Sequence, residues 1–252
     1  MKTIGLIAAM PQEIQPLLKK VGKRQSGKLG AILSYRFRIN DLDCLLIESG
    51  VGQRNAAQAV RSLLAVEKPE ILISFGIAGA AGDDLRIGDV ITGSMVYLLE
   101  AGIPVREFPL ASLDAAYQHE ISLVLGARDA RLVTGTILTT SGLQPAQGKI
   151  RELLHPVVEM ETFAIAEAAA GHGIPLLSLR SISDNPEAPI PFPIEKMYDA
   201  EYRLRIGWML LSILRRPRLL SQLTALSRNS GIAAENAARA VLAFLTQAFK
   251  NR

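Results

Sequence analysis

The chain has 252 residues, of which 49% are hydrophobic and 21% charged, a composition that excludes intrinsic disorder and suits one large domain. Its single cysteine, Cys44, excludes an internal disulfide framework and fits a reducing compartment. The net charge of +4 is accompanied by no aromatic ladder and no known nucleic-acid motif, so we expect no nucleic-acid partner. We expect a soluble, cytoplasmic protein.

Strand-length apolar runs recur along the chain, and several lack polar alternation, as expected for strands covered on both faces. They span residues 4–9, 44–47, 71–75, 90–96, 132–138 and 174–179. Helical patterns lie between them, at residues 12–21, 54–66, 113–125 and 162–171. This alternation predicts a three-layer α/β fold with a largely parallel central sheet.

Glycines mark two predicted turns. Gly50-Val51-Gly52 precedes the helix that begins near Arg54, and the glycine-rich residues 75–82 follow the strand that begins at Ile71. Glycine lets the backbone approach a ligand closely, so each segment is either a ligand loop or a plain tight turn. Neither has the Gly-Lys-Ser/Thr ending of a Walker A loop or the spacing of a dinucleotide fingerprint.

Carboxylates follow two of the apolar runs. Glu159-Met160-Glu161 stands where an apolar run enters a helix, and Asp184 lies just beyond the run at residues 174–179. Because carboxylates at strand ends of an α/β protein usually face a ligand, these residues indicate one acid site for a ribosyl group and another for a leaving base.

The segment after Asp184 has a different character. Four prolines within residues 186–193 predict a stiff, extended loop, because proline excludes helix there. Helices are expected at residues 194–214, 219–228 and 233–249. We expect one domain over residues 1–252, with 185–252 forming a proline-rich loop and additional carboxy-terminal helices. Six arginines lie late in the chain and face either acidic lipid or solvent: Arg203, Arg205, Arg215, Arg216, Arg218 and Arg228.

Four segments in order resemble the nucleoside phosphorylase/nucleosidase superfamily, and most of all its methylthioadenosine/S-adenosylhomocysteine nucleosidase branch. They are residues 4–13, 48–52, 158–161 and 180–184. The resemblance implies a nucleoside phosphorylase-like α/β/α fold with a mixed, barrel-like sheet. It also implies scission of the N-glycosidic bond of a purine nucleoside, no metal, no organic cofactor, and a homodimer.

Breaking this bond develops positive charge on the ribosyl ring and negative charge on the base. Asp184 is the expected acid, which protonates or hydrogen-bonds purine N7, and a positioned acid typically contributes about 10²–10⁴-fold. Ser183 would orient that carboxylate. The alternative makes Asp184 a helix cap or a turn residue before Pro186.

Glu161 is expected to accept hydrogen bonds from the ribose hydroxyls and to stabilise an oxocarbenium-like sugar. Met160 would pack against the sugar, unless it is a core residue. For Glu159, a salt bridge or a role at the helix start stands beside substrate contact. Met10, Gly79 and Ile77 complete the expected substrate-binding residues.

Glu13 decides the type of reaction. Phosphorylases of this superfamily place a glycine and an arginine in the first loop, whereas a glutamate repels phosphate and can activate water as a general base. By the resemblance, Arg180 helps to hold that water and completes the constellation with Glu161. Hydrolysis is therefore favoured over phosphorolysis. The alternative is that Glu13 is an exposed acid in the first turn of a helix.

The chain departs from the family pattern in two places. Ile77 stands where serine is usual, which removes a polar contact near the nucleophile and further disfavours phosphate. The base-binding loop at residues 141–148 is short and lacks the aromatic residue that stacks on adenine. The identity of the base is therefore weakly specified by this loop.

Residues 211–220 and 226–230 are similar to the tail of hopanoid-associated nucleosidases, which remove adenine from adenosylhopane. An apolar pocket for a 5′ substituent would be lined by Phe192, Met197, Trp208, Met209 and Leu210, while the arginines contact lipid. The alternative is a helical pair with its arginines in solvent. We expect a nucleosidase for an adenine nucleoside with a modified, apolar 5′ group. The rival functions are a phosphate-dependent phosphorylase and a catalytically silent nucleoside-binding protein.

Overall fold

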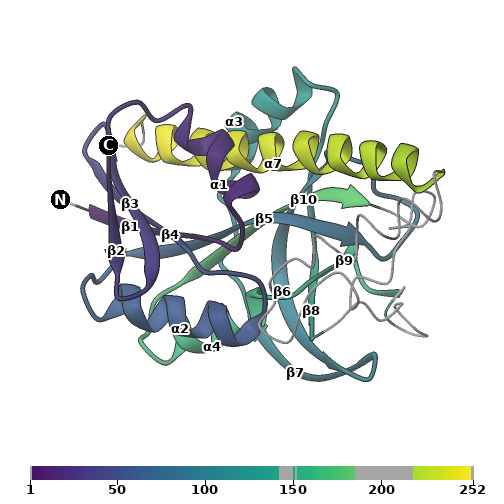
Figure 1. Cartoon of the computed structure of the whole chain (residues 1–252), viewed down its shortest axis with the longest axis horizontal. Helices are drawn as coiled ribbons and strands as arrows, with labels where there is room; N and C mark the ends of the chain where they lie inside the picture. Colours follow the sequence, from purple (N-terminus) through teal and green to yellow (C-terminus); the bar gives the residue numbers. More distant parts are fainter. Residues whose placement is uncertain (1, 142–149, 151, 185–217, 251–252) are drawn as a thin grey trace.

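The computed structural model describes residues 2–141, 150, 152–184 and 218–250 of the chain (Figure 1). Within them, ten strands form one sheet, whose members are β1 (Lys2–Ala8), β2 (Arg24–Leu29), β3 (Ile32–Ile39), β4 (Leu42–Glu48), β5 (Ile71–Ala80), β6 (Val90–Glu100), β7 (Ile103–Pro109), β8 (Leu132–Thr140), β9 (Pro156–Glu159) and β10 (Leu176–Asp184). The helices are α1 (Pro11–Leu18), α2 (Gln53–Leu64), α3 (Ala115–Gly126), α4 (Thr162–Ala170) and α7 (Arg218–Lys250).

The sheet lies between two helical layers, which confirms the predicted three-layer α/β/α fold. Helices α1, α3 and α7 cover one face and helices α2 and α4 cover the other (Figure 1). Each face has its own hydrophobic core, because the apolar strand residues alternate between the two sides.

The sheet is mixed and partly closed on itself. Strands β5, β10, β6, β8 and β9 pair in a cycle, which gives the barrel-like part, and β1, β4, β3 and β2 extend from it. The expectation of a largely parallel sheet, drawn from the alternation of elements, is wrong, because pairs such as β2–β3, β3–β4 and β6–β7 are antiparallel. These hairpins were missed because β2 and β7 are exposed strands without an apolar run.

Strand β5 continues through the glycines that were expected to form a turn. It pairs with β10 from Leu72 to Gly79 and with β9 at Gly79 and Ala80. The predicted turn at residues 75–82 is therefore wrong over most of its length. The glycines provide open space above a strand, and the candidate site uses that space.

Helix α7 is a single helix of 33 residues where two were predicted. Asn229, Ser230 and Gly231 do not interrupt it. A glycine in a helix interior costs only about 1 kcal/mol relative to alanine, and the buried stripe of Ala237, Val241 and Leu245 offsets that cost. The helix predicted at residues 194–214 lies outside the described residues. Of the helices described, none is long and apolar enough to cross a membrane.

Asn236 anchors α7 to the sheet. Its Nδ2 donates to the carbonyl of Gly88 at 2.9 Å, and its Oδ1 accepts from Arg128 Nε at 3.2 Å. The Asn236 side chain is buried, so these two bonds add to the apolar packing that fixes α7 over the turn before β6.

Asn236→Ala should lower the free energy of unfolding by about 1–3 kcal/mol, because it removes a buried hydrogen bond from the Gly88 carbonyl. Urea unfolding measures the change. Ser227→Ala, at an exposed position of the same helix, is the control and should change stability by less than about 0.5 kcal/mol. Equal values for the two variants would contradict the anchoring role.

Candidate active site

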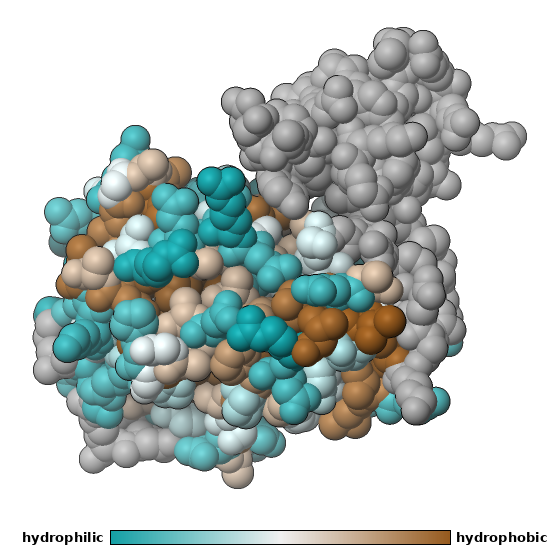
Figure 2. Space-filling model, turned by 90° about the horizontal axis from the view of Figure 1, so that it is seen from below, coloured by the Kyte–Doolittle hydropathy of each residue, from teal (hydrophilic) through white to brown (hydrophobic). Residues whose placement is uncertain are grey.

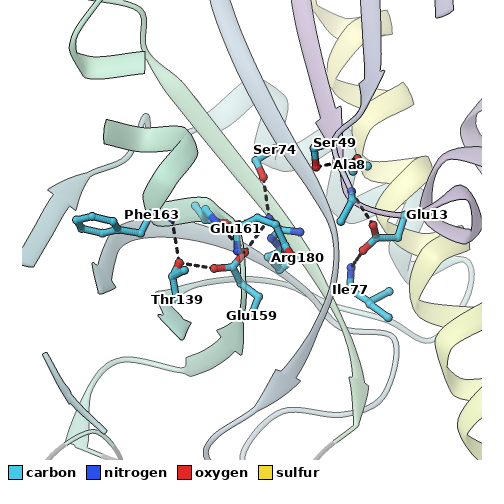
Figure 3. Close-up of polar contacts among 12 residues, drawn as sticks. Ala8, Glu13, Ser49, Ser74, Ile77, Thr139, Glu159, Glu161, Phe163 and Arg180 are labelled. Atoms are coloured by element: carbon cyan, nitrogen blue, oxygen red, sulfur yellow. Dashed lines mark hydrogen bonds and ion pairs between the residues drawn. The ribbon is translucent and has the colours of Figure 1, made fainter. Parts of the chain in front are cut away.

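The candidate site lies where several strand ends meet. Strands β1, β5 and β10 are mutually parallel neighbours, so their carboxyl ends lie at one edge of the sheet. Helix α1 follows β1, and α4 follows β9 close by. Figure 3 shows that Glu13, Glu159, Glu161 and Arg180 come together from these elements.

Glu13 lies in the first turn of α1 with its side chain only 2% exposed. Its Oε2 accepts the backbone N–H groups of Ala9 at 3.0 Å and Met10 at 2.9 Å, and its Oε1 accepts that of Ile77 at 2.9 Å. The alternative of an exposed first-turn acid is therefore wrong. Burial raises the pKa of Glu13, and the charge of Arg180 and the three backbone bonds oppose the rise only in part.

Arg180 is the only buried cation among the residues that the structure describes. Its Nη2 lies 2.9 Å from Oε2 of Glu159 and donates to Ser74 Oγ at 2.8 Å and Thr162 Oγ1 at 2.9 Å. Its Nε has no hydrogen-bond partner within the described part of the chain. One side of the guanidinium is therefore held by the protein.

Glu159 forms a salt bridge and binds the start of a helix, which is the role that stood beside substrate contact. Besides the ion pair with Arg180, its Oε2 accepts the backbone N–H groups of Glu161 at 3.0 Å and Thr162 at 2.8 Å, and the Thr162 hydroxyl at 2.8 Å. These amides belong to the start of α4. Glu159 therefore caps the helix and neutralises Arg180.

Glu161 precedes α4 and is also buried. Its Oε1 accepts the backbone N–H of Gly52 at 2.8 Å, so the turn at residues 50–52 directs an amide at a side-chain carboxylate. Burial and the negative charge of Glu159 raise the pKa of Glu161 to about 8, although Arg180 acts in the opposite direction. A carboxyl group in this state is protonated over much of the neutral range.

Asp184 is the last residue of β10 and lies directly above Gly79 of β5. Ser183 Oγ donates to Asp184 Oδ1 at 2.6 Å, as expected for an orienting hydroxyl. Burial raises the pKa of Asp184, and the bond from Ser183 opposes the rise. The residues after Asp184, including Pro186, lie outside the described part, so the turn alternative stays open.

Two glycines of β5 leave room for the polar groups. A Cβ on Gly76 would stand 2.2 Å from Glu13 Oε1 and 2.8 Å from Arg180 Nη1, so these two atoms face each other across Gly76. A Cβ on Gly79 would stand 2.6 Å from Asp184 Oδ2. The register of β5 and β10, with Gly76 opposite Arg180 and Gly79 opposite Asp184, produces both arrangements.

The remaining expected residues are placed less tightly. Met10 and Met160 are half-buried, and Ile77 contributes its backbone amide to Glu13. The expected base loop beyond Ser141 and the expected 5′ pocket lie outside the described residues. Sequence reasoning missed the residues that hold the charged side chains. Gly52 binds Glu161, Thr139 binds Glu159, Ser74 binds Arg180, and Thr162 binds both Glu159 and Arg180. Thr139 alone carried a usable signal, since it follows an apolar run at a strand end.

Comparisons with known proteins identify the family. The family model of the phosphorylase superfamily matches residues 3–203. A 5′-methylthioadenosine/S-adenosylhomocysteine nucleosidase of Listeria innocua is 33% identical over 212 residues, which cover 75% of this chain and 90% of that relative. The corresponding protein of Maridesulfovibrio salexigens is 29% identical over 198 residues, which cover 72% of this chain and 85% of that relative.

Solved structures share the whole fold. The same kind of nucleosidase from Neisseria meningitidis, in complex with methylthio-immucillin-A, has a TM-score of 0.71 at 19% identity and covers 98% of this chain and 99% of its own. Futalosine hydrolase of Helicobacter pylori has a TM-score of 0.69 at 17% identity and covers 96% of this chain and 97% of its own. At these identities the likeness establishes the fold, a nucleoside phosphorylase-like α/β protein. By the family match and the sequence relatives, the chain belongs to the phosphorylase superfamily.

Gly79→Ala should lower the rate of base release from a nucleoside by about 10²-fold, because the new Cβ must displace the Asp184 carboxylate. A steady-state assay measures the rate. Gly231→Ala in α7 is the matched control, because a Cβ there meets nothing within 4 Å. Full activity of Gly79→Ala would contradict the placement of Asp184.

Glu161 should make stability depend on pH. Its pKa is about 8 in the folded chain against 4.5 for the ordinary group, so the folded chain holds this proton longer and the free energy of unfolding falls as pH rises between these values. Glu161→Gln removes this contribution. Urea unfolding should therefore show the variant gaining stability relative to the parent from about pH 5 to about pH 8.

The raised pKa values of Glu13 and Asp184 act in the same direction, so the variant should reduce the slope without abolishing it. Glu152→Gln, at an exposed position, is the control and should leave the slope unchanged. A stability difference between Glu161→Gln and the parent that is constant with pH would contradict the assignment.

Proposed function

We propose that the chain is a purine nucleosidase that hydrolyses the N-glycosidic bond of an adenine nucleoside with a modified, apolar 5′ group. The observation that carries the proposal is the buried Glu13 carboxylate, which faces Arg180 across Gly76, with the Asp184 acid placed over Gly79 of the same strand. The names of the sequence relatives, which are methylthioadenosine/S-adenosylhomocysteine nucleosidases, support the substrate class.

The charges around Glu13 favour water over phosphate. Glu13, Glu159 and Glu161 are all buried near Arg180, and the nearest carboxylate to its guanidinium is that of Glu159. A dianionic phosphate would meet these acidic groups with Arg180 as the only buried cation among the described residues, and Arg180 is already paired with Glu159. A neutral water would not be repelled. Glu13 accepts the proton of that water, and Arg180 Nη1 lies beside it to orient the oxygen.

Asp184 supplies the proton to the leaving base. Its raised pKa keeps a larger protonated fraction at neutral pH than an exposed aspartate has, which suits a general acid. Ser183 fixes one of its oxygens, so the other, above Gly79, remains directed at the base. Gly79 thus contributes space for Asp184, and Ile77 contributes its backbone amide to Glu13.

Glu161 binds the ribose, and its ionised form stabilises the positive charge that develops there. One oxygen accepts the Gly52 amide N–H, and we assign the other to a ribose hydroxyl. Met160 precedes Glu161 in the sequence, and Met10 lies at the start of α1 beside Glu13. We assign both methionines to packing against the nucleoside. A catalytically silent binding protein would have no need for Glu13, Arg180 and Asp184 in this arrangement.

Further proposals concern the assembly and the surroundings of the chain. We propose a homodimer. Two exposed apolar residues of β7, Ile103 and Val105, support it. Figure 2 shows apolar patches on one face of the molecule. We also propose that the tail, which resembles that of hopanoid-associated nucleosidases, contacts lipid; its residues 211–217 lie outside the described part.

We further propose a cytoplasmic location and one domain over residues 1–252. Contacts of α7 with β10 and β5 support the single domain. Sedimentation tests the homodimer, and vesicle flotation tests the contact with lipid.

The function is tested by measuring adenine release from a panel of adenine nucleosides in phosphate-free buffer. The panel contains methylthioadenosine, S-adenosylhomocysteine and an adenosine with a long 5′ hydrocarbon. We expect release from at least one of them. The absence of release from every member would overturn the proposed function.

Asp184→Asn and Glu13→Gln should each lower kcat by about 10²–10⁴-fold, because the first removes the acid and the second the base. Circular dichroism checks that both variants fold. Asp83→Asn and Glu152→Gln make the same chemical changes at exposed positions and should retain full activity. Wild-type kcat in either site variant would contradict the role given to that residue.

A further inference from the structure

Thr139 lies near the end of β8 with its side chain fully buried. Its hydroxyl donates a short hydrogen bond to Glu159 Oε1 and accepts the backbone N–H of Phe163 at 2.9 Å (Figure 3). A threonine hydroxyl that donates to one fixed partner and accepts from another has no rotational freedom left. Thr139 therefore joins β8 to the carboxylate of Glu159 and to the first turn of α4.

The carboxylate of Glu159 needs such a partner. Its Oε2 carries all the contacts with Arg180, Glu161 and Thr162 described above, whereas Oε1 is held by Thr139. The terminal torsion of a glutamate is broad, so contacts at one oxygen leave the carboxylate plane free to turn. The bond from Thr139 fixes that plane.

The orientation of Glu159 is passed directly to Arg180. The Nη2 of Arg180 is 2.9 Å from Glu159 Oε2, and Nη1 of the same planar group is the atom that faces Glu13 across Gly76. A turn of the Glu159 carboxylate would therefore turn the guanidinium and move Nη1 relative to Glu13. Positioned groups at a reacting centre tolerate such displacements poorly.

We propose that Thr139 is a positioning residue for hydrolysis, which acts through Glu159 to hold Arg180 beside Glu13. This inference rests on the proposed function. Thr139 does not touch the nucleoside; it sets the angle at which the arginine meets the attacking water.

A purely structural role would arise from the other bond of Thr139. The Phe163 amide needs an acceptor at the start of α4, and the Phe163 ring packs on Phe108 at 5.3 Å and beneath the guanidinium of Arg106 at 5.2 Å. Loss of that acceptor would destabilise the chain without a specific effect on the chemical step. A positioning role therefore predicts a lower kcat in the folded variant, whereas a purely structural role predicts lower stability with kcat unchanged.

The test compares Thr139→Val with Thr139→Ser. Valine has the shape of threonine without the hydroxyl, whereas serine keeps the hydroxyl. We expect Thr139→Val to lower kcat for adenine release by about tenfold, as for the loss of a hydrogen bond to a charged group, and to change KM by less than about twofold. Thr139→Ser should restore kcat to within about threefold of the parent. If the valine variant does not fold, Thr139→Ala carries the same comparison.

Thr92→Val is the matched control. The Thr92 hydroxyl is buried on β6 without a hydrogen-bond partner among the described residues, so its loss should leave kcat unchanged. If Thr139→Val and Thr92→Val have the same kcat, the positioning role is wrong, even where Thr139→Val is less stable. A parent chain that releases no base from any nucleoside overturns the proposed function and this inference with it.

A double-mutant cycle tests whether the effect passes through Glu159. In the Glu159→Gln background the charge-assisted bond from Thr139 is already weakened, so Thr139→Val should lower kcat by less than about threefold there. A full tenfold loss in that background would overturn the proposed route through Glu159.

Discussion

The buried ion pair between Arg180 and Glu159 is the interaction on which the rest of the site depends. Burying two opposite charges carries a desolvation cost that only good geometry and further hydrogen bonds can offset. Here Ser74 and Thr162 bind the guanidinium, and Thr139 and the amides at the start of α4 bind the carboxylate. Five elements, β5, β8, β9, α4 and β10, are thereby tied to one point.

The pair also determines how much attraction from Arg180 is left for the carboxylates of Glu13 and Glu161. Because Glu159 takes the nearest position at Arg180, Glu13 and Glu161 are buried with only part of the attraction of one cation, and their pKa values are raised. A site with more carboxylates than cations suits a sugar that becomes positive in the transition state. The same imbalance opposes the binding of phosphate. We therefore attribute the preference for hydrolysis to the arrangement of the whole cluster and not to Glu13 alone.

Much of this arrangement could be predicted from the sequence. Apolar runs correctly indicated β1, β4, β6, β8 and β10, because these strands are covered on both faces. The glycines of β5 were misread as a turn, because glycine permits both a turn and a strand that side chains from other elements overlie. The hairpin strands β2 and β7 were missed because solvent-exposed strands need no apolar pattern. For the site, the carboxylates were found from motifs, but Gly52 and Thr139 were not. Gly52 meets Glu161 across 109 positions of sequence, and such a contact depends on the packing of separate elements.

The central claim is that this cluster directs water, and not phosphate, to the sugar. The most direct measurement is the identity of the sugar product when adenine is released in saturating inorganic phosphate, followed by phosphorus NMR. The structure predicts a free sugar, no sugar phosphate signal, and a rate of adenine release that phosphate does not increase. A sugar 1-phosphate, formed at a rate that rises with phosphate concentration, would contradict the account.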